Sequence, residues 1–319
     1  MNYFTKRLAV TILTLFLVSL LTFAAFRLIP GDAALLALGM DATEEQIAEL
    51  RTSMGLDKSF PEQYIIWLGD FISGRLGNSS RFMGASVSDL ITERLPVTFT
   101  LATFSFLFTI IIAFPFSVLT VKKENSLLDK NATTFSALGI SMPGFFLGVL
   151  LIWIFGIFFR LFIPGAYISY RDDVAGFFSY MIFPALAIAI PNAALVIKFL
   201  RSSLFLELKK DYVRTARSKG AKGPYILRRH ALKNASLPVI TLLGMIAGET
   251  FSGSIVIEQV FGIPGIGRLL ITSINARDYI VVKTLVIYIA FIVVIANTLA
   301  DIILQIMDPR IRLAGKAST

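Results

Sequence analysis

Two carboxylates lie deep inside apolar stretches of the sequence, where a charge is costly. Glu249 lies in the apolar stretch 237–257, and Asp301 lies in the stretch 281–307, four residues after Asn297. A charge at the centre of a bilayer costs about 2.5–3.5 kcal/mol, so each carboxylate needs a polar cavity or a partner. In a cavity, such a group can bind an amine or a metal ion of a passing solute. We therefore treat Glu249, Asp301 and Asn297 as candidate pathway residues, with hydrogen bonding to a neighbouring helix as the competing interpretation.

A second chemical feature is the basic segment 198–236, which carries 11 Lys or Arg. Residues 205–219 are good helix formers, and the glycines and proline that follow end the predicted helix. Val213, Ala216 and Gly220 recur at i, i+3 and i+7, so they share a small-residue face that another surface can approach closely. Such a face, flanked by basic side chains, suits docking by a soluble partner. A basic loop that touches lipid headgroups is the alternative.

The sequence offers little for enzymatic chemistry. It has no G-x-x-x-x-G-K-[ST] phosphate loop, no H-E-x-x-H pair and no G-x-S-x-G turn, so we expect no nucleotide hydrolysis by this chain. Cysteine is absent, and His230 is the single histidine, which excludes a thiolate or multi-histidine metal site. The glycine-rich run 262–267 has the wrong spacing for a dinucleotide fingerprint, and we expect a tight turn there.

The elements that position these residues are apolar and long. Of the 319 residues, 55% are hydrophobic and only 16% are charged, against about 25% charged residues in soluble domains. A membrane span needs about 20 mostly apolar residues. Six windows meet that length, which predicts an all-α membrane protein with six transmembrane helices, near 9–29, 97–121, 133–159, 180–199, 237–257 and 281–307.

The distribution of Lys and Arg predicts the orientation of these spans. With the N-terminus inside, the inner segments carry 19 Lys or Arg and the longer outer segments carry 9. Cytoplasmic loops carry an excess of Lys and Arg, so the N-terminus and the C-terminus are both expected inside. Because the basic residues divide by membrane side and form no recognition motif, nucleic-acid binding is not expected.

The segment between the first two spans is expected to be external and helical. Thr43 and Gln46 have the spacing of a capping box, and Gly55 suits a helix end. Pro61 can open a second short helix that carries several aromatic residues. The expected division of the chain is therefore a cytoplasmic tip with the first helix, an external segment, a domain of five further spans with a cytoplasmic loop, and a cytoplasmic tail, at 1–29, 30–96, 97–307 (loop 200–236) and 308–319.

Two features favour spans that pack closely and can move. Gly244, Gly248 and Ser252 are spaced four residues apart, as are Gly144 and Gly148, and small residues at this spacing let helices approach. Prolines within the spans offer places for kinks, at Pro115, Pro143, Pro184 and Pro191.

The basic segment contains, in order, Arg214-Thr215-Ala216-Arg217-Ser218-Lys219-Gly220, Arg229-His230-Ala231-Leu232-Lys233-Asn234-Ala235 and Leu237-Pro238. With these runs and others across nearly its whole length, the chain resembles the membrane-spanning permeases of bacterial ABC importers, in the dipeptide, oligopeptide and nickel branch. The stretch 211–238 resembles the cytoplasmic EAA loop of that family. Arg214 departs from the broad EAA pattern, because it stands where Glu is usual, and this puts any role for a Glu there in doubt. The other matching pieces, in order, are Gly31-Asp32, Met54-Gly55-Leu56-Asp57, Glu93-Arg94-Leu95-Pro96, Ser141-Met142-Pro143, Glu258-Gln259-Val260-Phe261, Pro264-Gly265-Ile266-Gly267-Arg268, Arg277-Asp278-Tyr279 and Asp308-Pro309-Arg310.

The resemblance implies a non-enzymatic subunit of a bacterial inner-membrane importer. Its implied partners are a second, homologous permease subunit, two ATP-binding subunits, an external solute-binding protein and membrane lipid. ATP and magnesium bind on the partner ATPases, and no cofactor is implied in this chain. The residues implied in coupling to the ATPases are Tyr212, Val213, Arg214, Thr215, Ala216, Arg217, Lys219 and Gly220.

The substrate stays open at this stage. Peptides lead, and nickel or a metal chelate is the alternative, because the run 234–238 and the pair Gly248-Glu249 look somewhat like the nickel subgroup. A membrane-embedded enzyme and a secondary transporter are weaker alternatives. The first lacks a nucleophile–base pair or a metal cluster in the spans, and the second lacks an inverted repeat.

Overall fold

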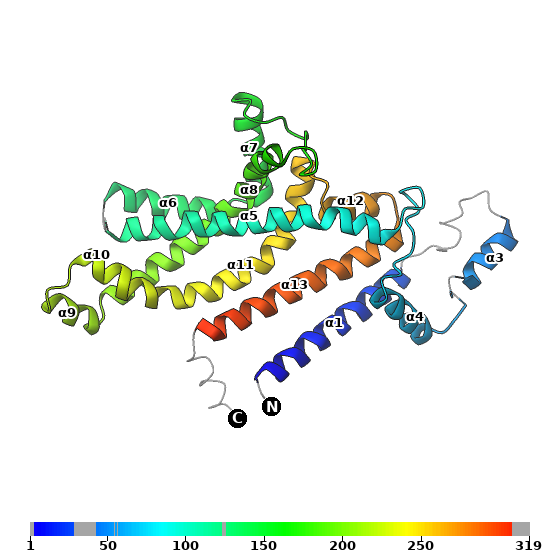
Figure 1. Cartoon of the computed structure of the whole chain (residues 1–319), viewed down its shortest axis with the longest axis horizontal. Helices are drawn as coiled ribbons and strands as arrows, with labels where there is room; N and C mark the ends of the chain where they lie inside the picture. The colour runs from blue at the N-terminus through cyan, green and yellow to red at the C-terminus, as the bar shows by residue number, and fades with distance from the viewer. Residues whose placement is uncertain (1–2, 29–42, 54, 56, 123–125, 308–319) are drawn as a thin grey trace. The chain divides into compact units, whose positions relative to one another are not determined.

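The chain is helical almost throughout (Figure 1). The computed structural model describes residues 3–28, 43–53, 55, 57–122 and 126–307. Within these ranges there is no β-strand, and the one isolated β-bridge joins Asn78 to Ser86. Parts of the family-like motifs lie outside the described residues, as does the expected cytoplasmic tail: Gly31-Asp32, Met54, Leu56 and 308–319.

The described residues form a series of helices joined by connecting segments. Two stretches are π-helical, η1 and η2, and each continues an α-helix. The bounds are α1 Tyr3–Leu28, α3 Glu44–Ser53, α4 Phe60–Ile72, α5 Val87–Lys122, α6 Leu127–Ser141, α7 Gly144–Leu151, η1 Ile152–Phe158, α8 Val174–Leu208, α9 Asp211–Ser218, α10 Gly223–Ile226, η2 Leu227–Ala231, α11 Leu232–Phe261, α12 Ile266–Asn275 and α13 Tyr279–Met307.

Five helical stretches are long and apolar enough to cross a membrane, and a bent pair brings the number to six if it forms one span. The five are the stretches Arg7–Arg27, Val87–Lys122, Val174–Leu208, Gly223–Phe261 and Tyr279–Ile302. The all-helical, multi-span prediction is confirmed. The third expected span differs in shape, because it consists of α6 and α7 with its π-helical extension, which meet at an angle of 107°.

Proline explains the break in this third span. Met142 has φ −89° and ψ 123°, an extended conformation, and Pro143 follows it directly. Proline disfavours the helical conformation of the residue before it and cannot donate a backbone hydrogen bond. The kink that the sequence predicts at Pro143 is thus confirmed, and it is a break of 107°.

The segment between the first two spans contains both short helices that its capping signals predict. At the start of α3, the Thr43 backbone N–H donates to Gln46 Oε1 at 3.0 Å, and the Gln46 N–H donates back to Thr43 Oγ1 at 3.3 Å. Pro61 lies in the first turn of α4. Helix α5 begins at Val87, so the last residues of the expected segment 30–96 are already helical.

The chain divides into two compact units, and each is described by itself. The first joins residues 1–96 to residues 265–294. In it, α4 lies against α1: the Tyr64 hydroxyl is 2.7 Å from Ser19 Oγ, and the Phe23 ring meets both Tyr64 and Trp67 at ring centroid distances of 5.4–5.5 Å. The aromatic residues of the external segment therefore pack on the first span.

The second unit joins residues 97–264 to residues 295–319, and α8 lies at its centre. This helix packs against α6, α7 and α11, and its buried side is rich in alanine, which allows close approach. A partly buried ion pair fixes α6 on it, since Arg201 donates through Nε and Nη2 to the two oxygens of Asp129, at 2.8 and 3.1 Å.

Two of the predicted small-residue positions, Gly148 and Gly248, allow neighbouring helices to approach closely, as the sequence predicts. A Cβ added at Gly148 would lie 3.2 Å from the Phe261 ring, and one added at Gly248 would overlap the side-chain amide of Asn297. Gly148 thus brings α7 close to α11, and Gly248 brings α11 close to α13.

Candidate functional site

The basic segment folds into a short helix, α9, between α8 and α10 (Figure 1). One side of α9 lies against the rest of the unit, because Val213 is 1% exposed. The opposite side is exposed and polar, with Asp211, Arg214, Thr215, Arg217, Ser218 and Lys219. Short helices need tertiary contacts to be stable, and Val213 supplies the buried contact here.

This arrangement changes the predicted docking face. The sequence grouped Val213, Ala216 and Gly220 on one face for a partner, yet Val213 is buried within its own unit and Ala216 is only half exposed. Helical periodicity identifies residues that share a face, but it does not say whether that face turns inward or outward. The surface that a partner can reach is therefore the polar side of α9 together with Gly220.

A polar network holds α9 to the helices on either side. The Tyr212 hydroxyl donates to Glu207 Oε2 at 2.7 Å, and Asn234 Nδ2 donates to the Tyr212 oxygen at 3.3 Å. Lys210 forms an ion pair with the other Glu207 oxygen. Glu207 ends α8 and Asn234 lies in the first turn of α11, so the network joins three helices.

The network also fixes the protonation state of the tyrosine. Burial raises the pKa of Tyr212 above its ordinary value, and the hydrogen bond to the Glu207 carboxylate raises it further. Tyr212 is therefore a neutral hydrogen-bond donor at physiological pH, and the hydrogen bond persists. The arrangement can transmit a displacement of α9 to both α8 and α11.

The loop after α9 depends on glycine. Gly220 has φ +80°, in the left-handed region, and its backbone N–H donates to the Arg217 oxygen at 2.9 Å. A side chain there would meet nothing within 4 Å in this chain, so the need for glycine is conformational.

The predicted end of the basic helix near Gly220 is confirmed, since α9 ends at Ser218. The stretch 205–219 is not one helix, however, because α8 ends at Leu208 and α9 begins at Asp211. Gly223 and Pro224 begin α10 and do not end a helix.

The candidate pathway residues differ in their surroundings. Glu249 is exposed on α11, and within the described residues it makes no hydrogen bond or ion pair. Asn297 and Asp301 are half exposed on α13, and Asn297 faces Gly248 across the contact between α11 and α13. The structure thus places Asn297 in a helix contact, and it leaves Glu249 available to another molecule.

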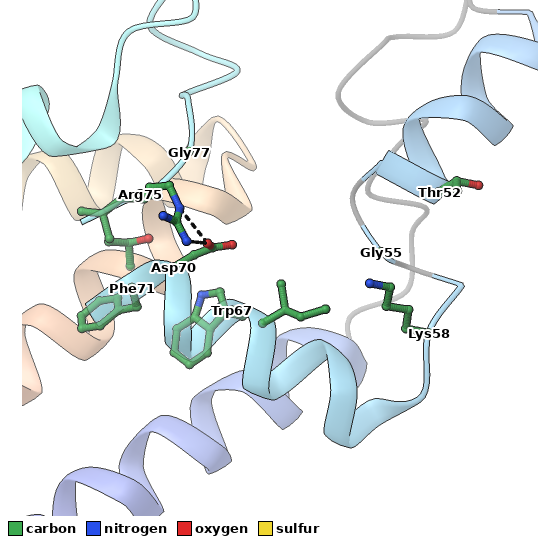
Figure 2. Close-up of a pocket in the computed structure, with 11 residues that line it drawn as sticks. Thr52, Gly55, Lys58, Trp67, Asp70, Phe71, Arg75 and Gly77 are labelled. Atoms are coloured by element: carbon green, nitrogen blue, oxygen red, sulfur yellow. Dashed lines mark hydrogen bonds and ion pairs between the residues drawn. The ribbon is translucent and has the colours of Figure 1, made fainter. Parts of the chain in front are cut away.

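The first unit contains a pocket of about 400 Å³, lined by residues of the segment between the first two spans and by Thr284 of α13 (Figure 2). Trp67 and Phe71 line it, and Arg75 donates through Nε and Nη2 to Asp70 Oδ1 at 3.0 and 2.9 Å. Lys58 also lines the pocket, and its charge acts on the nearby Glu62 carboxylate. The pocket therefore combines aromatic surface with charged groups of both signs.

Comparison with known families decides the class of protein. The family described as binding-protein-dependent transport system inner membrane component matches residues 105–313, and its N-terminal counterpart matches residues 1–102. The chain belongs to this family. It is thus a multi-pass inner-membrane permease subunit of an ABC importer, which works with ATPase and solute-binding partners and has no catalytic activity or cofactor of its own.

Two curated relatives align with the permease from end to end. A probable peptide ABC transporter permease protein of Sinorhizobium fredii is 35% identical over 310 residues, which cover 97% of this chain and 99% of the relative. The oligopeptide transport system permease protein AppB of Bacillus subtilis is 34% identical over 311 residues, covering 97% and 98%. The resemblance that the sequence motifs suggested is confirmed.

The permease also contains buried polar groups for which the sequence predicted no structural role, although Glu258 was noted as part of a family-like run. Glu258 is fully buried near the end of α11, where Thr98 Oγ1 donates to its Oε1 at 2.6 Å. Its position at the end of an apolar stretch was the available signal. Asp129 and Arg201 are 72 residues apart, and nothing in a single sequence indicates their pairing.

Proposed function

We propose that this subunit forms half of the translocation pathway of a peptide importer. The observation that carries the proposal is the end-to-end similarity to permeases whose names specify peptide or oligopeptide transport. Nickel or a metal chelate becomes the less favoured substrate, because these relatives are named for peptides.

The proposed assembly contains a second, homologous permease subunit and two ATP-binding subunits, with a solute-binding protein on the outer side. The exposed polar side of α9 docks on an ATP-binding subunit, and the Tyr212 network carries its displacement into α8 and α11. The residues proposed for coupling are Arg214, Thr215, Arg217, Lys219 and Gly220 at the surface, with Tyr212, Val213 and Ala216 supporting them from within.

The proposed orientation places both termini and the segment 200–236 in the cytoplasm, and most of the segment 30–96 outside. The excess of Lys and Arg on the inner side, 19 against 9, supports it. A reporter fused near Lys222 is expected inside, and one fused near Gly77 outside. Reporters on the same side would contradict the six-span topology.

Glu249 is the proposed pathway contact for the amino group of a peptide. Glu249 is exposed and makes no hydrogen bond or ion pair with the described residues, whereas the Asn297 side chain packs against Gly248. A carboxylate in a membrane span needs a polar environment, which a solute pathway supplies. Asp301, one turn after Asn297, is the second carboxylate near this path.

Uptake by reconstituted complexes tests the proposal. Proteoliposomes that contain the permease, its partner subunits and the binding protein are supplied with ATP and either a labelled peptide or nickel. We expect ATP-dependent accumulation of peptide that stops when the binding protein is omitted. Accumulation of nickel without peptide uptake would overturn the substrate assignment, and the family assignment would remain.

A further inference from the structure

A basic cavity lies where α11 begins. Its volume is about 290 Å³, and four side chains line it: Arg229, His230, Lys233 and Asn234. Arg229 and Lys233 are four residues apart, as are His230 and Asn234, so all four share one side of the helical stretch. The Tyr225 ring, 56% exposed, meets the His230 ring edge-on at 5.7 Å and flanks this basic cavity.

The positive charge of the basic cavity is not balanced by the surrounding chain. From Tyr212 to Gly248 the sequence contains seven Lys or Arg and no Asp or Glu. Neither Arg229 nor Lys233 has a carboxylate partner among the described residues. Two cationic side chains, a histidine and an amide around one cavity form a donor set for an anion with several oxygen atoms, such as a phosphate group.

The distance of the basic cavity from the hydrocarbon region of the membrane indicates the source of that anion. The apolar stretch of α11 begins at Leu237, four residues after Lys233 and eight after Arg229. At 1.5 Å per residue, these positions are about 6 Å and 12 Å from the start of the hydrocarbon region. The polar layer of each leaflet is about 5–8 Å thick, and long basic side chains can reach into it from beyond. An exposed tyrosine is also typical of this layer.

We propose that the basic cavity binds the phosphate group of an anionic phospholipid in the cytoplasmic leaflet. The proposal uses the orientation given under the proposed function, in which this end of α11 is on the inner side. The family resemblance implies contact with membrane lipid in general, and the proposal adds a defined phosphate site in this subunit. Asn234 lines the cavity and donates to Tyr212, so the bound headgroup lies next to the network that holds α9.

The test measures lipid retention by the purified, complete transporter in nanodiscs of phosphatidylcholine, with or without phosphatidylglycerol. Each basic side chain near an anionic surface is worth about a factor of five in binding, so Arg229→Gln combined with Lys233→Gln is expected to weaken phosphatidylglycerol retention about 25-fold. The matched control is Arg228→Gln combined with Lys222→Gln. It removes the same charge from the same segment but leaves the cavity lining intact, and less than a fivefold change is expected.

A charge-preserving pair keeps the test valid if the neutral variant fails to assemble. Arg229→Lys combined with Lys233→Arg is expected to retain phosphatidylglycerol within about twofold of the unaltered protein, because both cations remain near the surface. Equal loss in the cavity variant and the matched control would overturn the proposal, since it would indicate a diffuse charge effect.

Two other results would also overturn it. Inorganic phosphate could displace phosphatidylglycerol from the unaltered protein and bind it equally well in nanodiscs of pure phosphatidylcholine. In that case the site takes a soluble anion and not a lipid. If the cavity variant loses the ATP-binding subunits in both kinds of nanodisc, the surface belongs to the protein partner. Lipid retention needs no transported substrate, so failure here is distinguishable from failure of the peptide assignment.

Discussion

The hydroxyl oxygen of Tyr212 lies 2.7 Å from Oε2 of Glu207, and this hydrogen bond joins the exposed helix α9 to the end of the buried helix α8. The same oxygen accepts a hydrogen bond from Asn234 at the start of α11. One side chain thus links the proposed docking helix to two helices of the membrane unit. In our account, Tyr212 is a positioning residue for coupling, and the exposed side of α9 contacts the ATPase.

Replacing Tyr212 with Phe tests this link. The change removes a hydrogen bond to a charged acceptor that is 8% exposed, which costs about 1.5–3 kcal/mol. Transport and ATP hydrolysis stimulated by the loaded binding protein are expected to fall, while basal ATP hydrolysis and subunit retention change little. Tyr225→Phe is the matched control, because Tyr225 has no part in the network. Normal stimulation in Tyr212→Phe would contradict the positioning role.

Local features of the fold were predictable from the sequence. Thr43 and Gln46, three residues apart, form the capping hydrogen bonds that their types and spacing predict, and Pro61 opens α4. Gly220 ends the basic helix region with a positive φ. These features depend on neighbouring residues, as do the apolar stretches that mark the spans, so one sequence contains the information.

Features that depend on distant residues were not predictable. The buried Asp278 carboxylate accepts from Ser79 Oγ at 2.5 Å, although the two residues are 199 positions apart. The inward orientation of Val213 and the pairing of Asp129 with Arg201 also depend on helix packing. Pro143 predicted a kink in the apolar stretch 133–159, but the sequence does not specify its angle of 107°.

Gly220→Val is expected to impair coupling through the backbone. A left-handed conformation costs a residue with a side chain about 1–2 kcal/mol, and β-branching makes it less favourable. Stimulated ATP hydrolysis by the reconstituted complex is the measurement. Gly223→Ala is the control, since Gly223 has open space around it and no positive φ. Gly220→Asn tolerates this conformation and should be milder. Equal activity of the valine and asparagine variants would show that strain does not matter here.

The contact between Gly248 and Asn297 predicts a rescue. A methyl group at position 248 would overlap the Asn297 side-chain amide, so Gly248→Ala is expected to destabilise the permease by about 1–3 kcal/mol. Adding Asn297→Ala removes the overlapping atoms and should restore most of the stability, measured by the thermal transition in detergent. Gly253→Ala, on the same helix with open space around it, should be neutral. A double variant as unstable as Gly248→Ala would contradict this contact.

Glu249→Gln is expected to lower uptake of a peptide with a free amino group by about tenfold. A hydrogen bond between charged groups contributes about 1.5–3 kcal/mol, and the neutral amide loses most of it. Assembly with the partner subunits should be unchanged, because Glu249 has no bond to the described part of this chain. The same peptide with an acetylated amino terminus is the control. Equal reduction for both peptides would argue against contact with the amino group.

Site-specific cross-linking tests the central claim, that α9 is the surface through which this subunit is driven by an ATPase. The chain has no cysteine, so a single introduced thiol reports one position without interference. Thr215→Cys and Ser218→Cys place a thiol on the exposed side of α9, and Ser73→Cys places one on the external segment.

In the assembled complex, a short thiol-to-amine reagent is expected to join positions 215 and 218 to an ATP-binding subunit. The yield should change when a non-hydrolysable ATP analogue is bound, and position 73 should give no such product. Absence of the product from both α9 positions in a complex that retains its ATPases and transports peptide would contradict the account.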